Sequence, residues 1–294
     1  MSTENRKQVR DFLVSRRGKV TPQQAGLQYY GGNRRVPGLR REEVATLAGL
    51  SVDYYARIEK GNISGVSETI LHAISDTLQL DEAERTYLFD LARTANAGHR
   101  TPRREPARRV RPAVQRILDS MATTPALVRN GRLDVLAANA LGRALFAPLF
   151  DSPVTAPGQA PNHARFGFLD PRAHEFHPAW NLSANTNVAI LRTEAGRDPY
   201  NKDLTDLIGE LSTRSEDFRT RWADQNVRLH RTGTKSFCHP VVGVVTVDFE
   251  AMELSADAGL TITAYSPEPA SPSADALALL GSWVTTGSHA GETG

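Results

Sequence analysis

Cysteine is almost missing from this chain of 294 residues, since Cys238 is the only one. A single thiol excludes a disulfide within the chain and a zinc site made of several cysteines. Apolar runs of about 18 residues, which a membrane-spanning helix needs, are missing too. The first residues, MSTENRKQVR, lack the apolar core of a secretion signal. We therefore expect a cytoplasmic protein that makes no membrane contact.

The usual signatures of catalysis are also lacking. No glycine-rich phosphate loop follows a strand, and no G-x-S-x-G turn occurs. Cys238 and His239 are neighbours in a segment with strand character, so their side chains point to opposite faces and cannot form a nucleophile and base pair. A proline-rich segment, which we expect to be irregular, holds a loose set of metal-ligand residues: His163, Asp170, His174 and His177. Without a helix to fix their spacing, metal binding is the weaker interpretation, and the sequence predicts neither catalysis nor a cofactor.

Net charge is small, +2, but it is unevenly distributed. Lys and Arg outnumber Asp and Glu by 19 to 13 over residues 1–110, whereas residues 111–294 hold 16 against 20. A basic half suits a module that binds a polyanion, although such an excess also occurs on ordinary solvated surfaces. The acidic half suits sensing or assembly better than DNA contact. A chain of this length is expected to form two domains.

Residues 39–61, LRREEVATLAGLSVDYYARIEKG, predict two short helices joined by a tight turn. Gly49 breaks the first helix, and Ser51 is placed to cap the second. Tyr55 and Ile58 are three residues apart and should face the core, which leaves the rest of the second helix open. This is the layout of a helix-turn-helix that reads DNA.

The flanking residues complete a domain of five helices. We expect one helix at 6–17, one after Ser67, and a last one that begins with a capping box of Asp81 and Glu84. Residues 98–110 follow as a basic, proline-rich linker, which either lies along phosphates or makes no contact.

The second half alternates strand and helix patterns. An Asn130-Gly131 pair predicts a hairpin with a two-residue type I′ turn. Further strands are expected near 245–249 and 260–264, and helices near 181–195, 201–226 and 273–284. These elements predict an α+β domain in which helices cover one face of an antiparallel sheet.

The first motif resembles the Xre and phage-repressor type of helix-turn-helix, with Ala45, Gly49, Leu50 and Ser51 in the turn. The resemblance implies that the second helix is the recognition helix and that Glu59 pairs with Arg16 or Arg17. It also implies a phosphate contact for Arg41. The full set of candidate DNA-binding residues is Arg34, Arg35, Arg41, Ser51, Val52, Asp53, Tyr54, Ala56, Arg57 and Lys60. Arg57 is the best candidate for guanine, whereas Asp53 either accepts from cytosine or favours the helix N-terminus.

Residues 110–284 resemble the MmyB-like ligand-binding domain, through TPALV at 124–128, LDVLAAN at 133–139, FLDP at 168–171 and LRTEAGRDP at 191–199, and through K-x-F-x-HPVVG at 235–243. The chain departs from the family pattern at Ala179 and Cys238. The resemblance implies a PAS-like fold and a small apolar or fatty-acid-like effector. The predicted domains are 1–97 for DNA binding, 111–285 for ligand binding and dimerisation, and 286–294 as a disordered tail.

Five side chains are candidates for lining the effector pocket, although large aromatic residues over a sheet are more often plain core. They are Asn139, Trp180, Phe218, Trp222 and His239. We interpret the chain as a transcription regulator that binds double-stranded DNA, as a homodimer on a palindromic operator, because one recognition helix reads few base pairs. Two alternatives are a regulator whose second half is a protein-interaction module without ligand, and an enzyme with an accessory DNA-binding domain.

Overall fold

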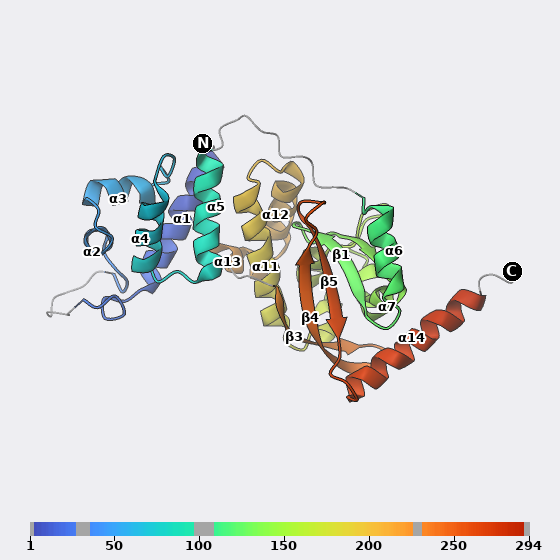
Figure 1. Cartoon of the computed structure of the whole chain (residues 1–294). Helices are drawn as coiled ribbons and strands as arrows, with labels where there is room; N and C mark the ends of the chain where they lie inside the picture. Colours follow the sequence, from blue (N-terminus) through green and yellow to red (C-terminus); the bar gives the residue numbers. More distant parts are fainter. Residues whose placement is uncertain (1–2, 28–35, 97–108, 226–230, 291–294) are drawn as a thin grey trace. The chain divides into compact units, whose positions relative to one another are not determined.

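A computed structural model shows how the chain folds (Figure 1). The structure describes residues 3–27, 36–96, 109–225 and 231–290. The predicted linker at 98–110 falls almost wholly outside these residues, as do Arg34 and Arg35.

The chain forms two compact units. Unit 1 consists of Met1–Arg103, Arg192–Thr205 and Arg221–Leu229. Unit 2 consists of Arg104–Leu191, Asp206–Thr220 and His230–Gly294. Each unit therefore combines segments that are distant in the sequence, and the domain boundaries predicted from the sequence remain a prediction.

Unit 1 begins with five helices, as the sequence predicts. They are α1 (Thr3–Lys19), α2 (Arg41–Leu47), α3 (Val52–Glu59), α4 (Glu68–Thr77) and α5 (Glu82–Asn96). Side-chain caps explain where α4 and α5 begin. Ser67 accepts a hydrogen bond from the backbone N–H of Ile70 at 3.4 Å, and Asp81 and Glu84 exchange two bonds at 2.9 and 3.2 Å.

One apolar cluster holds these helices together. Phe12 and Leu13 of α1 are fully buried, as are Tyr55 and Ile58 of α3. The ring of Phe12 packs edge-on against Tyr87 of α5, with 5.1 Å between ring centroids. The apolar face predicted for each helix is therefore the face that builds the core.

Unit 1 also takes in the C-terminal end of α11 (Trp180–Arg197) and of α13 (Glu216–Ala223). Arg192 is 2% exposed, donates to the Gln225 side chain at 2.6 Å, and holds its guanidinium 4.2 Å from the Trp222 ring centroid. Burial lowers the pKa of Arg192. Arg16 of α1 donates to the carbonyl of Gln225. Two buried arginines thus meet at Gln225.

Unit 2 is built on an antiparallel sheet in the order β2-β1-β5-β4-β3. The strands are β1 (Ala126–Asn130), β2 (Val135–Ala138), β3 (Thr232–His239), β4 (Gly243–Glu253) and β5 (Leu260–Ser266). This is the α+β, PAS-like architecture that the sequence predicts.

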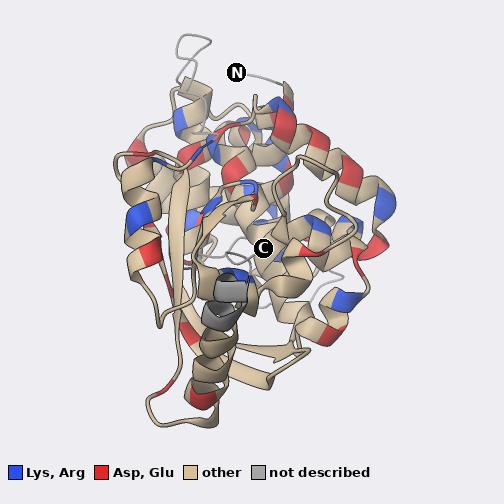
Figure 2. Cartoon of the chain, turned by 90° about the vertical axis from the view of Figure 1, so that its right-hand side faces the viewer, with Lys and Arg blue, Asp and Glu red and all other residues tan. Residues whose placement is uncertain are grey.

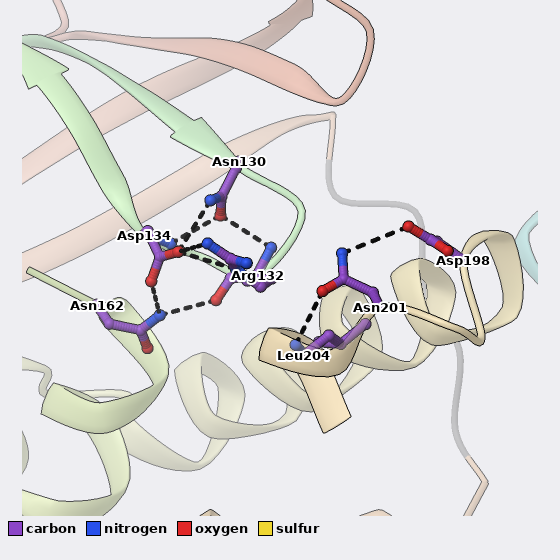
Figure 3. A network of polar contacts seen from close by, with 7 residues as sticks. All are labelled: Asn130, Arg132, Asp134, Asn162, Asp198, Asn201 and Leu204. Atoms are coloured by element: carbon purple, nitrogen blue, oxygen red, sulfur yellow. Dashed lines mark hydrogen bonds and ion pairs between the residues drawn. The ribbon is translucent and has the colours of Figure 1, made fainter. Parts of the chain in front are cut away.

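The hairpin between β1 and β2 is present, but the predicted type I′ turn is wrong. The loop is longer than two residues, and its left-handed residue is Leu133, with φ 69°, while Gly131 is not left-handed. Asn130 explains this, because its side-chain oxygen accepts from the N–H groups of Arg132 and Asp134, both at 3.0 Å (Figure 3). Asn162 ties the loop down by donating to the Asp134 carboxylate at 2.7 Å.

Helices pack on both faces of the sheet, although the sequence predicted only one covered face. One face carries α7 (Ala140–Leu145), α8 (Ala147–Phe150), α9 (His163–Leu169) and α10 (Arg172–Phe176). The other face of β1 and β5 is covered by α6 (Pro112–Ser120), whose Val114 and Leu118 pack with Val128 and Ile262. None of α6 to α10 was predicted.

The helix predicted at 201–226 is two helices, α12 (Lys202–Arg214) and α13. Ser215 separates them, because its hydroxyl accepts from the N–H of Phe218 at 3.2 Å and caps a new start. Asn201 caps α12 by accepting from Leu204 at 3.1 Å (Figure 3).

The last helix, α14 (Pro272–Ala290), is longer than predicted, so a disordered tail beginning at 286 is wrong for 286–290. Asp275 is its one Asp, Glu, Lys or Arg, and Figure 2 shows this helix largely without charge beside helices that carry both signs. Across the described residues, no helix is both long and apolar enough to span a membrane.

Candidate DNA-binding surface and effector site

The turn between α2 and α3 has the geometry of a helix-turn-helix. Gly49 takes φ 67°, which glycine adopts without the strain that other residues meet there. Leu50 then donates its N–H to the carbonyl of Ala45 at 2.8 Å, and Ser51 caps α3 by accepting from Tyr54 at 3.2 Å. The turn therefore fixes the angle at which α3 leaves α2.

Glu59, at the end of α3, is a buried anion held by two arginines. Its side chain is 1% exposed and forms ion pairs with Arg17 of α1 and Arg41 of α2. The hydrogen bond and the charge of Glu59 raise the pKa of Arg41. Burial and the Glu59 charge also raise the pKa of Tyr55, whose hydroxyl donates to Glu59 at 3.5 Å. Glu59 thus joins three helices.

These contacts decide between the predicted partners of Glu59. Arg17 is the partner, whereas Arg16 pairs with Glu84 of α5. Arg41 was expected to contact phosphate, but its Nε is engaged by Glu59. Its half-exposed side chain therefore has a structural function, and its phosphate contact stays a proposal.

The outward side of α3 is open. Val52 is 47% exposed, and Asp53, Arg57 and Lys60 are exposed as well, while Tyr54 and Ala56 are half-buried. The guanidinium of Arg57 lies over the ring of Tyr54, 5.0 Å from its centroid. Such stacking holds a long side chain extended on the surface.

The predicted pocket residue Asn139 is fully engaged in local structure. Its amide group donates to the carbonyls of Met121 and Thr124 at 2.8 and 2.7 Å, and its oxygen accepts from Ala126 at 3.1 Å and Gly142 at 2.7 Å. Asn139 is the N-cap of α7 and a clamp on β1. A ligand contact would have to break this network.

His239 and Trp180 are engaged in a similar way. The Nε2 of His239 bonds the carbonyl of Ala144 at 3.0 Å, and its Nδ1 accepts from the N–H groups of Val241 and Val242. Burial lowers the pKa of His239. Trp180 donates its indole N–H to Gly167 at 2.9 Å and stacks on a histidine ring.

The remaining two candidates do not join them in one site. Phe218 is fully buried and packs edge-on against Phe168, with 5.1 Å between the rings. Trp222 belongs to unit 1, under Arg192. The five predicted ligand residues are thus divided between the units, and those of unit 2 act mainly in packing and capping.

Sequence reasoning missed a polar group on the inner face of the unit 2 sheet. Lys235 of β3 holds its ammonium 4.8 Å from the ring centroid of Phe249. Burial and the charge of Arg129 lower the pKa of Lys235 to about 8. Burial and Lys235 lower the pKa of His177 to about 3. The alternation of Lys235 and Phe237 in K-x-F was the available signal, because it places a lysine on the side of a core residue.

A surface pocket of about 640 Å³ lies elsewhere in unit 2. It is lined by part of β2, by Arg143, and by the loop that follows α8. The guanidinium of Arg143 lies 4.8 Å from the ring centroid of Phe150. None of the predicted ligand residues lines this pocket.

The candidate metal residues lie in a helical segment, not the irregular one that was expected. His163 begins α9 and His174 lies in α10. Asp170 is engaged by Arg172 at 2.7 Å and by Ser152 at 2.5 Å, and the hydrogen bonds that it accepts hold its pKa low against the opposing effect of burial. In the described part of the chain, no group of three His, Cys, Asp or Glu side chains is placed to hold a metal ion.

Comparison with known families agrees with this two-part structure. Residues 110–280 match the MmyB-like transcription regulator ligand binding domain, and residues 14–88 match a helix-turn-helix domain. The chain therefore is a DNA-binding transcription regulator. It belongs to the MmyB-like transcription regulators. No catalytic family matches it among these findings, and no curated protein matches the chain.

Proposed function

We propose that this regulator recognises a specific operator through the outward face of α3. The observation that carries the proposal is the division of α3 into a buried side, with Tyr55, Ile58 and Glu59, and an open side. Because the buried side is locked to α1 and α2, the open side is presented as a rigid surface that fits a major groove.

The side chains on this surface have distinct chemistry. Arg57 offers two donors for the O6 and N7 of guanine, and Asp53 accepts from the amino group of cytosine. Val52 is an exposed apolar group suited to the methyl of thymine. Ser51, Tyr54, Ala56 and Lys60 border these three, so we assign them to the backbone and the groove wall, together with Arg41, Arg34 and Arg35.

Dimeric binding is part of the proposal. One α3 covers only a few base pairs, so useful specificity needs two half-sites about one helical turn apart. A palindromic operator is therefore expected, read by a homodimer in the cytoplasm, where the chromosome lies.

We also propose that unit 2 binds a small effector, apolar or fatty-acid-like, that changes operator affinity. The family match supports a small ligand. Coupling is supported by residues 192–205 and 221–229, which lie within the ligand-binding family match and pack in unit 1 with α1 and α5. Arg197 pairs with Asp90 of α5 at 3.3 Å, and Thr94 donates to the carbonyl of Gly196 at 3.1 Å.

Selection of duplexes from a random pool tests the DNA half of the proposal. We expect a two-fold symmetric motif with a guanine in each half-site. A pool that shows no enrichment, while the protein still retards DNA nonspecifically, would contradict sequence-specific reading.

Extraction of the purified protein, followed by a thermal-shift screen of apolar metabolites, tests the effector half. A ligand that binds the folded state should raise the melting temperature by mass action. If extraction and a broad screen both find nothing, unit 2 is better interpreted as a protein-interaction module.

A further inference from the structure

The inner face of the unit 2 sheet carries a lysine among core residues. In β3, Lys235 pairs with Val247 of β4, two residues from Phe237, which pairs with Val245. Phe237, Val245 and Val247 are at most 1% exposed. Because alternate residues of a strand share a face, Lys235 points toward the core side of the sheet, at the edge strand.

Other polar groups converge on the same place. Arg129 of β1 and Tyr265 of β5 lie on the inner face as well, as the pairing of β5 with β1 and β4 requires. His177, which follows α10, lies above this face with its ring 5.6 Å from that of Phe237. Lys235 and His177 are deep in the domain but keep accessible surface. That combination is what side chains lining a recess have.

The recess holds positive charge without an acid. Arg129 and His177 are the titratable neighbours of Lys235 whose pKa effects couple to it, and neither is an anion. Within the described ranges, Lys235 makes no ion pair, and its one contact of a polar kind is with the Phe249 ring. An ammonium that is removed from water without a counter-ion is costly. The missing partner of this cluster is an anion.

An aromatic wall adjoins the cluster. Phe176 stacks on Phe237 with 5.2 Å between centroids, and Phe146 packs edge-on against Phe237 at 5.1 Å. Tyr265 lies 5.2 Å from Phe146 and closes the row. A ligand with its charged end at Lys235 would therefore meet an apolar surface with the rest of its length.

We propose that the effector is an organic monoanion, a carboxylate on an apolar body, and that its head group pairs with the ammonium of Lys235 on the inner face of the sheet. This inference rests on the proposed effector-binding function and adds the charge of the ligand and the residue that selects it. Arg129 adds to the positive field, and the hydroxyl of Tyr265 supplies a further donor at the same recess.

The test compares a carboxylate with its neutral isostere on the full chain. Dodecanoate and dodecanamide are titrated into the wild type, Lys235→Met and Lys235→Arg, with octanoate and hexadecanoate as length controls. Dodecanoate should bind the wild type and Lys235→Arg, and Lys235→Met should weaken it by roughly tenfold or more, as loss of a charge-assisted bond does. Dodecanamide should bind wild type and Lys235→Met alike.

Arg143→Met is the matched control, because it removes a cation from the surface pocket of the same unit. It should leave the affinity for dodecanoate unchanged. If Arg143→Met weakens dodecanoate and Lys235→Met does not, the anion lies in the surface pocket and the proposal is wrong, although effector binding stands.

The wild type alone gives an independent readout through pH. Lys235, with a pKa of about 8, should change charge in the measured range, whereas His177, with a pKa of about 3, stays neutral. Burial raises the pKa of Tyr265, which also stays neutral, and Arg129 stays charged. Since a protonated lysine is needed, affinity for dodecanoate should be constant below about pH 7 and fall as pH rises past about 8.

A flat profile up to pH 9, or equal affinity of the wild type for dodecanoate and dodecanamide, would overturn the head-group assignment. If no carboxylate of the series binds while the metabolite screen finds a neutral ligand, the assignment fails and the sensing function survives. If both are empty, both fail.

Discussion

Glu59 shows how one residue fixes the geometry of the DNA-binding surface. It is buried at the end of the recognition helix and satisfied by Arg17, Arg41 and the hydroxyl of Tyr55. Removing the anion leaves two guanidinium groups facing each other with no partner between them. Breaking a buried ion pair in this way costs more than the pair itself contributes.

We expect Glu59→Gln to lower the free energy of unfolding by roughly 3 kcal/mol. The matched control is Glu42→Gln, because Glu42 is exposed and its pair with Arg40 spans 3.3 Å at the surface. Such a pair contributes at most about 1 kcal/mol. Urea unfolding of both variants makes the comparison, and similar losses for the two would show that Glu59 is not a structural lock.

At the scale of the element, the two glycines that flank the recognition helix differ in what surrounds them. Gly49 has φ 67° and open space where a Cβ would lie. Gly61 has φ 96°, and a Cβ there would overlap the carbonyl of Arg6 in α1. The first glycine permits a turn, whereas the second also permits close approach of two helices.

Gly49→Ala should therefore destabilise unit 1 by about 1 kcal/mol, the cost of a left-handed alanine. Gly61→Ala should destabilise it clearly more, since α1 and the end of α3 must separate. Thermal unfolding measures both. Equal losses would mean that contact with α1 does not position α3.

The sequence predicted those elements whose signals are local. Caps at Ser51, Ser67 and Asp81 and the apolar spacing of Tyr55 and Ile58 each lie within one helix, so the five helices and the open face of α3 follow from them. The hairpin turn failed because the Asn130 side chain competes with the backbone for N–H groups, which a dipeptide rule does not include.

The unit 2 recess was not predictable in the same way. Arg129, His177 and Lys235 are far apart in the chain, and only the order of the strands brings them together. Short helices such as α8 and α10 show too little periodicity to be recognised. Asn139 and Trp222 were chosen by type, but their contacts depend on tertiary packing.

For the whole molecule, the question is how ligand binding reaches DNA. Arg192 lies in the ligand-binding family match but is buried in unit 1, where it and Arg16 of the first helix share Gln225. A change in α11 on ligand binding would therefore reach α1 directly. Coupling of this kind must be reciprocal between ligand and DNA.

We expect Arg192→Gln to retain ligand binding but to reduce the effect of ligand on operator affinity. Arg219→Gln is the control, because Arg219 is exposed on α13 and pairs only with Glu216 at 3.9 Å among the described residues. Ligand titrations monitored by melting temperature and by operator binding separate the two effects. Unchanged coupling in Arg192→Gln would contradict a route through Gln225.

The central claim is that the open face of α3 reads base sequence, and the affinity of Arg57→Ala for operator and scrambled DNA tests it most directly. Lys60→Ala serves as a control that should weaken both DNAs alike. Arg57→Ala should lose about 1 to 3 kcal/mol on the operator and little on scrambled DNA. Equal losses on both DNAs would show that Arg57 contacts phosphate and would contradict base reading by this helix.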